Sequence, residues 1–261
     1  MEKQYGRTLL TNTVTNYIKV GAKLLSAVFL TRIIFLNLGN DFYGFWTLLW
    51  AIFGYSLLLD FGFGKTVQKY TAEAKFTGNQ NRFNQIISAV FFSYLLMAVI
   101  ICLAALLMSS DLQGLFNLDC DIHEPYFQKV FMIFGLGIAL VFPTGIIPEI
   151  LTGLHKIYLR NYVIVVNCVL ELAGIWLILH HGGSLLAMTV FIACLNLSTN
   201  LVMSVIVWRQ MPGLRLTFSG LKWSIFKEIA DFSLFAYMLT MANMVIFKTD
   251  RIVLGAMVCI F

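Results

Sequence analysis

QIISAVFFSYLLMAVIICLAALLM, the stretch from residue 85 to residue 108, contains no charged side chain. A helix of roughly 20 mainly apolar residues is long enough to cross the hydrocarbon core of a bilayer. Strands and the buried helices of soluble domains are usually shorter than this run. The stretch therefore predicts a membrane-spanning α-helix.

The composition of the whole chain agrees with a membrane location. Of its 261 residues, 59% are hydrophobic and 12% are charged, against roughly 45 to 50% and 25% in soluble domains. A soluble domain needs more charged side chains to cover its surface. Since lipid offers no hydrogen-bond partners to the backbone, we expect an all-α membrane protein.

Six runs are long enough to be spans, and a seventh follows. We expect a polytopic protein with a six-helix amino-terminal lobe over residues 1–225. Residues 226–261 should form the start of a seventh transmembrane helix, which would be the first helix of a truncated second lobe. The last residues are apolar and lack a polar anchor, as in a fragment. The runs are 12–36, 42–63, 85–108, 127–149, 161–179, 185–208 and 229–261.

The cations are distributed unevenly over the connections. Twelve Lys or Arg residues lie in the leader and in the even-to-odd connections, whereas the alternate connections hold Lys129 at an edge. Cytoplasmic loops retain such cations, so we expect a cytoplasmic amino terminus. Two amphipathic segments, 65–77 and 221–230, should lie against anionic membrane lipids. The cations counted are Lys3, Arg7, Lys65, Lys69, Lys75, Arg82, Lys156, Arg160, Arg209, Arg215, Lys222 and Lys227.

A polar stripe runs along the first predicted span. Asn16, Lys19 and Lys23 lie on one helix face together with Asn12 and Ser26. One interpretation is a cavity wall whose two cations bind an anionic cargo. The other is that both lysines extend to the headgroups. We favour the cavity wall because Asn and Ser gain nothing from facing lipid.

Further polar groups lie inside other predicted spans. Asn167 and Glu171 are one helical turn apart on the fifth span. Glu171 could be a coupling site for a proton or a cation, or it could form a structural ion pair with a first-span cation. We favour the ion pair. On the seventh span, we expect Asp250 and Arg251 at an inner wall or near the outer boundary of the membrane. Pro143 and Pro148 should break the fourth helix, as a gate or as a static kink.

The sequence contains no recognisable motif for enzymatic catalysis. It contains no metal-ligand spacing, no Ser/His/Asp cluster and no complete phosphate-binding loop. We therefore expect a non-enzyme without a cofactor, and no nucleic-acid partner.

Three stretches together resemble one family. They are LDFGFGKTVQKYTAEAKFTGN (59–79), LTGLHKIYLRNYVIVVN (151–167) and KTDRIVLGA (248–256). The first is similar to that family's Asp-x-Gly turn followed by a Tyr-x-Ala-Glu segment. The chain thus resembles the amino-terminal half of polysaccharide exporters, or O-antigen flippases, of the multidrug/oligosaccharidyl-lipid/polysaccharide exporter superfamily. Its members have two six-helix lobes and move cargo between them by alternating access.

The resemblance implies a function and a set of residues. It implies flipping of an undecaprenyl-pyrophosphate-linked oligosaccharide across the bacterial inner membrane, in contact with other polysaccharide-assembly proteins. The alternatives are a drug or metabolite antiporter of the same superfamily, coupled to Na⁺ or H⁺, and an inactive fragment. The residues that fall on the family pattern are Asp60, Gly62, Tyr70, Glu73, Asp250 and Arg251.

Overall fold

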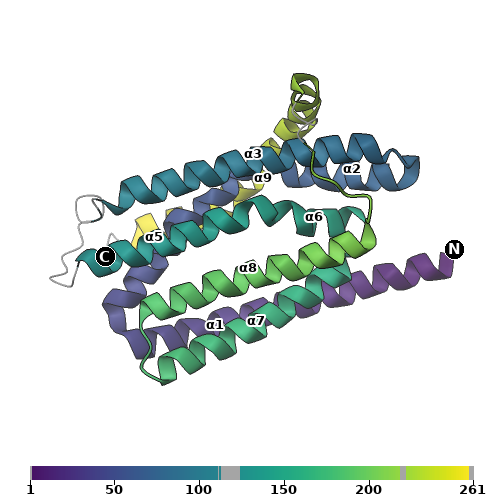
Figure 1. Ribbon diagram of the computed structural model, residues 1–261. Helices are drawn as coiled ribbons and strands as arrows, with labels where there is room; N and C mark the ends of the chain where they lie inside the picture. Colours follow the sequence, from purple (N-terminus) through teal and green to yellow (C-terminus); the bar gives the residue numbers. More distant parts are fainter. Residues whose placement is uncertain (1, 111, 113–123, 218–221, 259–261) are drawn as a thin grey trace.

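The computed structural model describes the backbone of residues 2–110, 112, 124–217 and 222–258 (Figure 1). The side chains of residues 2–5, 57, 124, 240 and 243–258 are outside this description. The elements are α1 (Glu2–Gly54), η1 (Tyr55–Asp60), α2 (Phe63–Thr77), α3 (Gln80–Ser109), α5 (Glu124–Val141), η2 (Phe142–Gly145), α6 (Ile146–Gly153), α7 (Ile157–His180), α8 (Leu185–Gln210) and α9 (Trp223–Val258).

The expected all-α fold is confirmed. Within the described ranges the secondary structure is helical, and four helices are long and apolar enough to cross a membrane. They correspond to the predicted runs 85–108, 127–149, 161–179 and 185–208. The chain is therefore a multi-pass membrane protein. The four helices are Gln80–Ser109, Pro125–Gly153, Ile157–His180 and Leu185–Gln210.

The first two predicted runs are joined and then broken. α1 continues through both, with a kink at Gly39, whose backbone (φ 81°, ψ −179°) is readily adopted only without a Cβ. The prediction of one helix over 42–63 is wrong at its end. There the α-helix stops at Gly54, a 3₁₀ segment follows to Asp60, and Phe61 is left-handed.

Basic connections gather at one end of the bundle. Figure 1 places the amino terminus, the α2–α3 turn, the α6–α7 turn and the segment 211–217 that follows α8 at this end, and the α7–α8 turn at the opposite end. We call it the basic end. The alternation agrees with the predicted pattern of connections, while the cytoplasmic orientation stays a prediction.

The two amphipathic segments have different outcomes. The segment 65–77 is a separate helix, α2. Most of 221–230 is not separate, because from Trp223 onward it forms the first turns of α9. The boundary between the predicted lobes therefore falls inside a continuous helix.

Two apolar clusters form the core. One joins the second part of α1 to α3, α5, α7 and α8, and includes Phe53 and Phe134. The other joins α2, α3 and α6 to the start of α9, and includes Tyr94 and Ile150. The space between these clusters contains the candidate site.

Candidate functional site

A cavity of about 620 Å³ lies inside the lobe. Its walls come from the second part of α1, from η1, α3, α5, η2, α6 and α8, and from the first residues of α2. Two of these walls are 3₁₀ segments that interrupt longer helices. Discontinuous helices commonly line transport sites because their backbone is polar where it is not helical.

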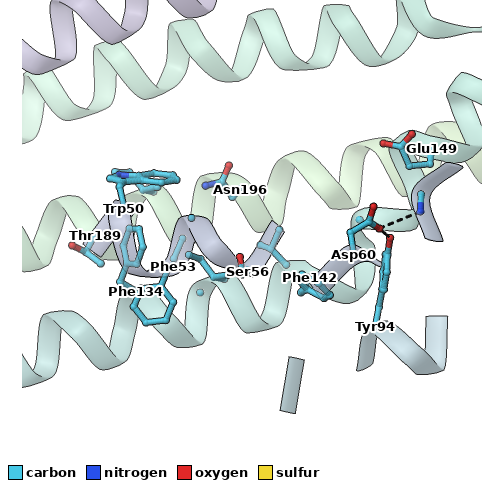
Figure 2. A pocket seen from close by; sticks show the side chains of 18 residues that line it. Trp50, Phe53, Ser56, Asp60, Tyr94, Phe134, Phe142, Glu149, Thr189 and Asn196 are labelled. Carbon is cyan, nitrogen blue, oxygen red and sulfur yellow. Dashed lines mark hydrogen bonds between the residues drawn. The ribbon is translucent and has the colours of Figure 1, made fainter. Parts of the chain in front are cut away.

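One end of the cavity is aromatic. Trp50 and Phe53 of α1 pack against Phe134 of α5, with ring centroids 5.3 and 5.4 Å from Phe134. Figure 2 shows these three rings grouped away from the acidic residues, with Thr189 beside them. This end offers an apolar surface with few hydrogen-bonding groups.

The other end of the cavity is acidic, with Asp60 on one side. Asp60 ends η1, and its Oδ1 accepts hydrogen bonds from the backbone N–H of Gly64, at 3.1 Å, and from the Tyr94 hydroxyl (Figure 2). The left-handed residues Phe61 and Gly62 turn the chain so that the carboxylate reaches the first turn of α2. A negative charge is favourable at the amino terminus of a helix.

Glu149 of α6 completes the acidic end. A Cβ on Gly64 would lie 3.5 Å from Glu149 Cγ and 3.5 Å from Asp60 Oδ2, so both side chains approach the same glycine. Glu149 accepts a hydrogen bond from Gln68 and forms an ion pair with Arg160 of α7, Nη1 to Oε1, at 3.3 Å. The same Nη1 donates to Thr152 Oγ1 at 3.0 Å. Both carboxylates are therefore held by donors from neighbouring elements.

Among the family-pattern residues of the first stretch, Asp60 lines the cavity, Gly62 lies just before α2, and Tyr70 and Glu73 lie on α2. Gly62 has φ 77°, and a Cβ there would be 2.4 Å from the backbone oxygen of Ser233. Only glycine allows α9 to approach so closely. Glu73 lies on α2, partly exposed.

Tyr70 joins α2 to α9 outside the cavity. Its hydroxyl donates to Glu228 at 2.7 Å, and Arg82 pairs with the same carboxylate oxygen at 2.5 Å. Burial and the bond to Glu228 raise the pKa of Tyr70 to about 12. The hydrogen bond from Tyr70, together with Arg82, lowers the pKa of Glu228.

The predicted break in the fourth helix is present. α5 ends at Val141, Pro143 lies buried in η2, and Pro148 lies in α6. A role of this break as a gate stays a prediction.

The stripe on α1 is in part a contact with α7. Asn12 donates to the backbone oxygen of His155 at 3.0 Å and accepts from the backbone N–H of Tyr158 at 2.9 Å. Ser26 reaches the backbone oxygen of Cys168 at 3.5 Å. Asn12 and Ser26 therefore join neighbouring elements, and they are not among the residues that line the cavity described above.

The cations of the stripe remain accessible. Asn16 and Lys23 are exposed, Lys19 is half-buried, and Lys19 Nζ donates to Asn16 Oδ1 at 2.7 Å. These three residues are not among those that line the cavity between the two apolar clusters. The lobe thus has two charged regions, one positive on α1 and one negative at the cavity.

Asn167 and Glu171 of α7 interact with different neighbouring helices. Asn167 donates to Thr199 of α8 at 2.6 Å. Glu171 is half-buried and in electrostatic reach of Lys23, yet among the described side chains it forms no ion pair within 4 Å. No described cation of the first span therefore pairs with Glu171 within 4 Å, and the role of Glu171 stays a prediction. Asp250 and Arg251 belong to the backbone of α9, and their side chains lie outside the described residues.

Sequence patterns did not identify Tyr94, Glu149, Arg160 or Trp50 as site residues. Tyr94 lies within an apolar run, and Arg160 was counted only as a basic loop residue. The one available signal was Glu149 directly after Pro148, a carboxylate at the end of a span.

We compared the chain with known protein families, curated proteins and solved structures. No protein-family model matches the chain, and a search of curated proteins found no match. The chain resembles a solved structure of a MOP superfamily transporter from Pyrococcus furiosus, described as having a binding pocket of reverse polarity that suggests a different function (TM-score 0.71, 14% identity). It also resembles an outward-facing multidrug resistance MATE family transporter of the same superfamily (TM-score 0.69, 14% identity).

Both alignments cover 93% of this chain and 55% of the other. The chain therefore spans about half the length of the solved structures that it matches. At this identity the likeness establishes the fold and nothing about the cargo. The chain has the fold of MOP superfamily transporters over this half of their length.

Proposed function

We propose that the protein translocates undecaprenyl-pyrophosphate-linked oligosaccharides across the bacterial inner membrane by alternating access, with its amino terminus in the cytoplasm. The observation that carries the proposal is the positive charge on α1. Lys19 and Lys23 lie one turn apart, and the charge of Arg160 acts on Lys19 as well. Among the described side chains, neither lysine is in an ion pair within 4 Å.

Uncompensated cations on a membrane helix are costly unless they meet water or an anion. A pyrophosphate concentrates negative charge on a few oxygens, so two ammonium groups would offset part of the cost of removing it from water. A cargo bound in this way would also stabilise the state of the transporter that exposes α1. Membrane lipids and other polysaccharide-assembly proteins would be its partners.

The test measures binding of undecaprenyl pyrophosphate to the chain in lipid nanodiscs. Replacing Lys19 and Lys23 by Ala should weaken binding at least about tenfold, because two charge-assisted contacts are lost. Arg32→Ala is the matched control, since Arg32 is an exposed cation on the same helix, nearly opposite Lys23. Equal affinity in the double variant and the wild type would refute the proposal. Flipping of a fluorescent lipid-linked glycan in liposomes is the second readout.

A drug or metabolite antiporter coupled to Na⁺ or H⁺ is the second candidate function. Two observations favour it: Glu171 has no ion-pair partner within 4 Å among the described side chains, and the cavity is acidic and aromatic. Glu171 would be the coupling residue, with Asn167 one helical turn away and bonded to Thr199. Efflux of an organic cation that depends on Na⁺ or pH and disappears in Glu171→Gln would support this function over the flippase.

A further inference from the structure

Helices α2 and α6 pack so closely that they form one body. A Cβ on Gly153 of α6 would lie 2.6 Å from the backbone oxygen of Gln68 and 2.6 Å from Thr71 Cβ, both on α2. Gln68 also donates to Glu149 of α6. Backbones in such close contact cannot slide past each other without repacking. The two helices would therefore move together.

Every connection of this pair to the rest of the lobe contains a break in helical geometry. The 3₁₀ segments η1 and η2 precede α2 and α6, respectively. Gly78 (φ 68°) follows α2, and His155 (φ 60°) follows α6. Short non-helical segments at the ends of an element are where hinges absorb changes in φ and ψ. The pair is thus bounded by four sites that can bend.

The pair also lines the acidic end of the cavity. Gly64 of α2 and Glu149 of α6 are lining residues, as is Asp60 at the end of η1, which precedes α2. Figure 2 shows Asp60, Tyr94 and Glu149 together at this end of the cavity. α2 and α6 lie at the basic end of the bundle (Figure 1). Tilting the pair would therefore open the cavity toward the basic end.

Two kinds of contact hold the pair in place. On the α3 and α9 side, apolar contacts that include Val67, Ile150 and Ile229 are joined by the hydrogen bonds of Thr66 with Ser233 and of Tyr70 with Glu228. On the α7 side Arg160 holds α6 at two points, Glu149 and Thr152. Its Nε is buried and has no hydrogen-bond partner within the described part of the chain. An incompletely satisfied, charged contact is easier to open than an apolar core, because water can replace its hydrogen bonds.

We propose that α2 and α6 form a lid on the cavity, hinged at η1 and η2, and that Arg160 is the latch that keeps it closed against α7. The role of the lid in a cycle rests on the transport function proposed above, whereas its geometry does not depend on the cargo. Opening breaks the contacts of Arg160 with Glu149 and Thr152 and tilts the pair away from α7. The apolar contacts with α3 and α9 remain.

The test measures distances between spin labels by double electron–electron resonance in nanodiscs, without any cargo. The native cysteines are first replaced. One label at Lys75 of α2 and one at Val166 of α7 report the lid, and labels at Val166 and Arg209 report the α7–α8 pair, which should not move. All three positions are exposed.

Arg160→Gln should increase the population of longer α2–α7 distances about tenfold, because one charge-assisted contact is lost. Arg160→Lys should have a smaller effect, since a single ammonium keeps the charge but cannot bridge Glu149 and Thr152 in the same way. Arg215→Gln, an exposed arginine at the same end, is the matched control and should leave the distances unchanged.

Two outcomes would overturn the latch. In one, Arg160→Gln and Glu149→Gln both keep the wild-type α2–α7 distances. In the other, the α7–α8 distance broadens as much as the α2–α7 distance, which would make Arg160 a general packing residue. If the lid opens as expected while the lysines bind no pyrophosphate, the flippase proposal fails and the lid stands.

Discussion

The two charged regions of the lobe are built in opposite ways. The positive region lies along one helix, α1, and its members are one turn apart, with Lys23 exposed. The negative region lies where several broken helices meet, and Asp60 and Glu149 each accept hydrogen bonds from other elements. We therefore expect the exposed helix face to tolerate substitution, whereas the cluster at the helix breaks should depend on close packing.

The largest effect should come from the packing beneath the negative region. Gly153→Ala places a Cβ 2.6 Å from a backbone oxygen and a side-chain carbon of α2, which must then move apart. We expect a loss of about 3 kcal/mol in the free energy of unfolding. On α1, Gly21→Ala meets nothing within 4 Å and should be neutral or stabilise by up to about 1 kcal/mol.

Thermal unfolding of both glycine variants in detergent checks this contrast. A lower midpoint for Gly153→Ala with an unchanged or higher midpoint for Gly21→Ala would support it. Equal midpoints would mean that α2 and α6 separate easily, and the lid would lose its rigid body.

The second-largest effect should come from replacing the cation that pairs with the negative region, Arg160, compared with a cation of the positive region, Lys23. The side chains of Arg160 and Glu149 are 29% and 18% exposed. Arg160→Gln should therefore cost about 2 kcal/mol of stability, because Glu149 loses its charged partner. Lys23→Gln should cost less than about 0.5 kcal/mol, since Lys23 is exposed. Chemical denaturation of the two variants measures the difference, and a larger loss for Lys23→Gln would reverse the comparison.

The third effect lies within the α1–α7 contact. Asn12 is 8% exposed and makes two hydrogen bonds to the α7 side, so Asn12→Ala should cost about 1.5 kcal/mol. Ser26→Ala removes one bond of 3.5 Å and should cost less than about 0.5 kcal/mol. Hydrogen exchange of the α7 backbone amides near Tyr158 should rise in the first variant and not in the second. A rise in both would mean that the contact acts as one cooperative unit.

The sequence predicted features that depend on one helix at a time. Four spans and α2 follow from apolar or amphipathic runs, and the shared face of Lys19 and Lys23 follows from helical periodicity. The sequence did not predict the 3₁₀ segment at the end of the second run, because nothing in the residues of Tyr55–Asp60 distinguishes a 3₁₀ helix from an α-helix. The meeting of Asp60, Tyr94 and Glu149 depends on how three elements pack. Spacing along the chain carries no information on that packing.

The smallest effect should come from the exposed junction of α2 and α9, where Glu228 is 38% exposed. Its pKa is lowered chiefly by the hydrogen bond from Tyr70, so its contribution to stability is complete above the ordinary value of 4.5 and is lost as the pH falls through the lowered pKa. Solvent screening limits this contribution to less than about 0.5 kcal/mol.

Tyr70→Phe removes the main cause of the low pKa and leaves Arg82 in place. The pKa of Glu228 should then rise toward 4.5, and the acid-dependent loss of stability should become smaller. Unfolding midpoints between about pH 3 and pH 7 measure this change. If the curves of the variant and the wild type are parallel, Tyr70 does not set the charge of Glu228. The junction would then be stabilised by its apolar contacts and by the close approach at Gly62, as the α2–α6 pair is at Gly153.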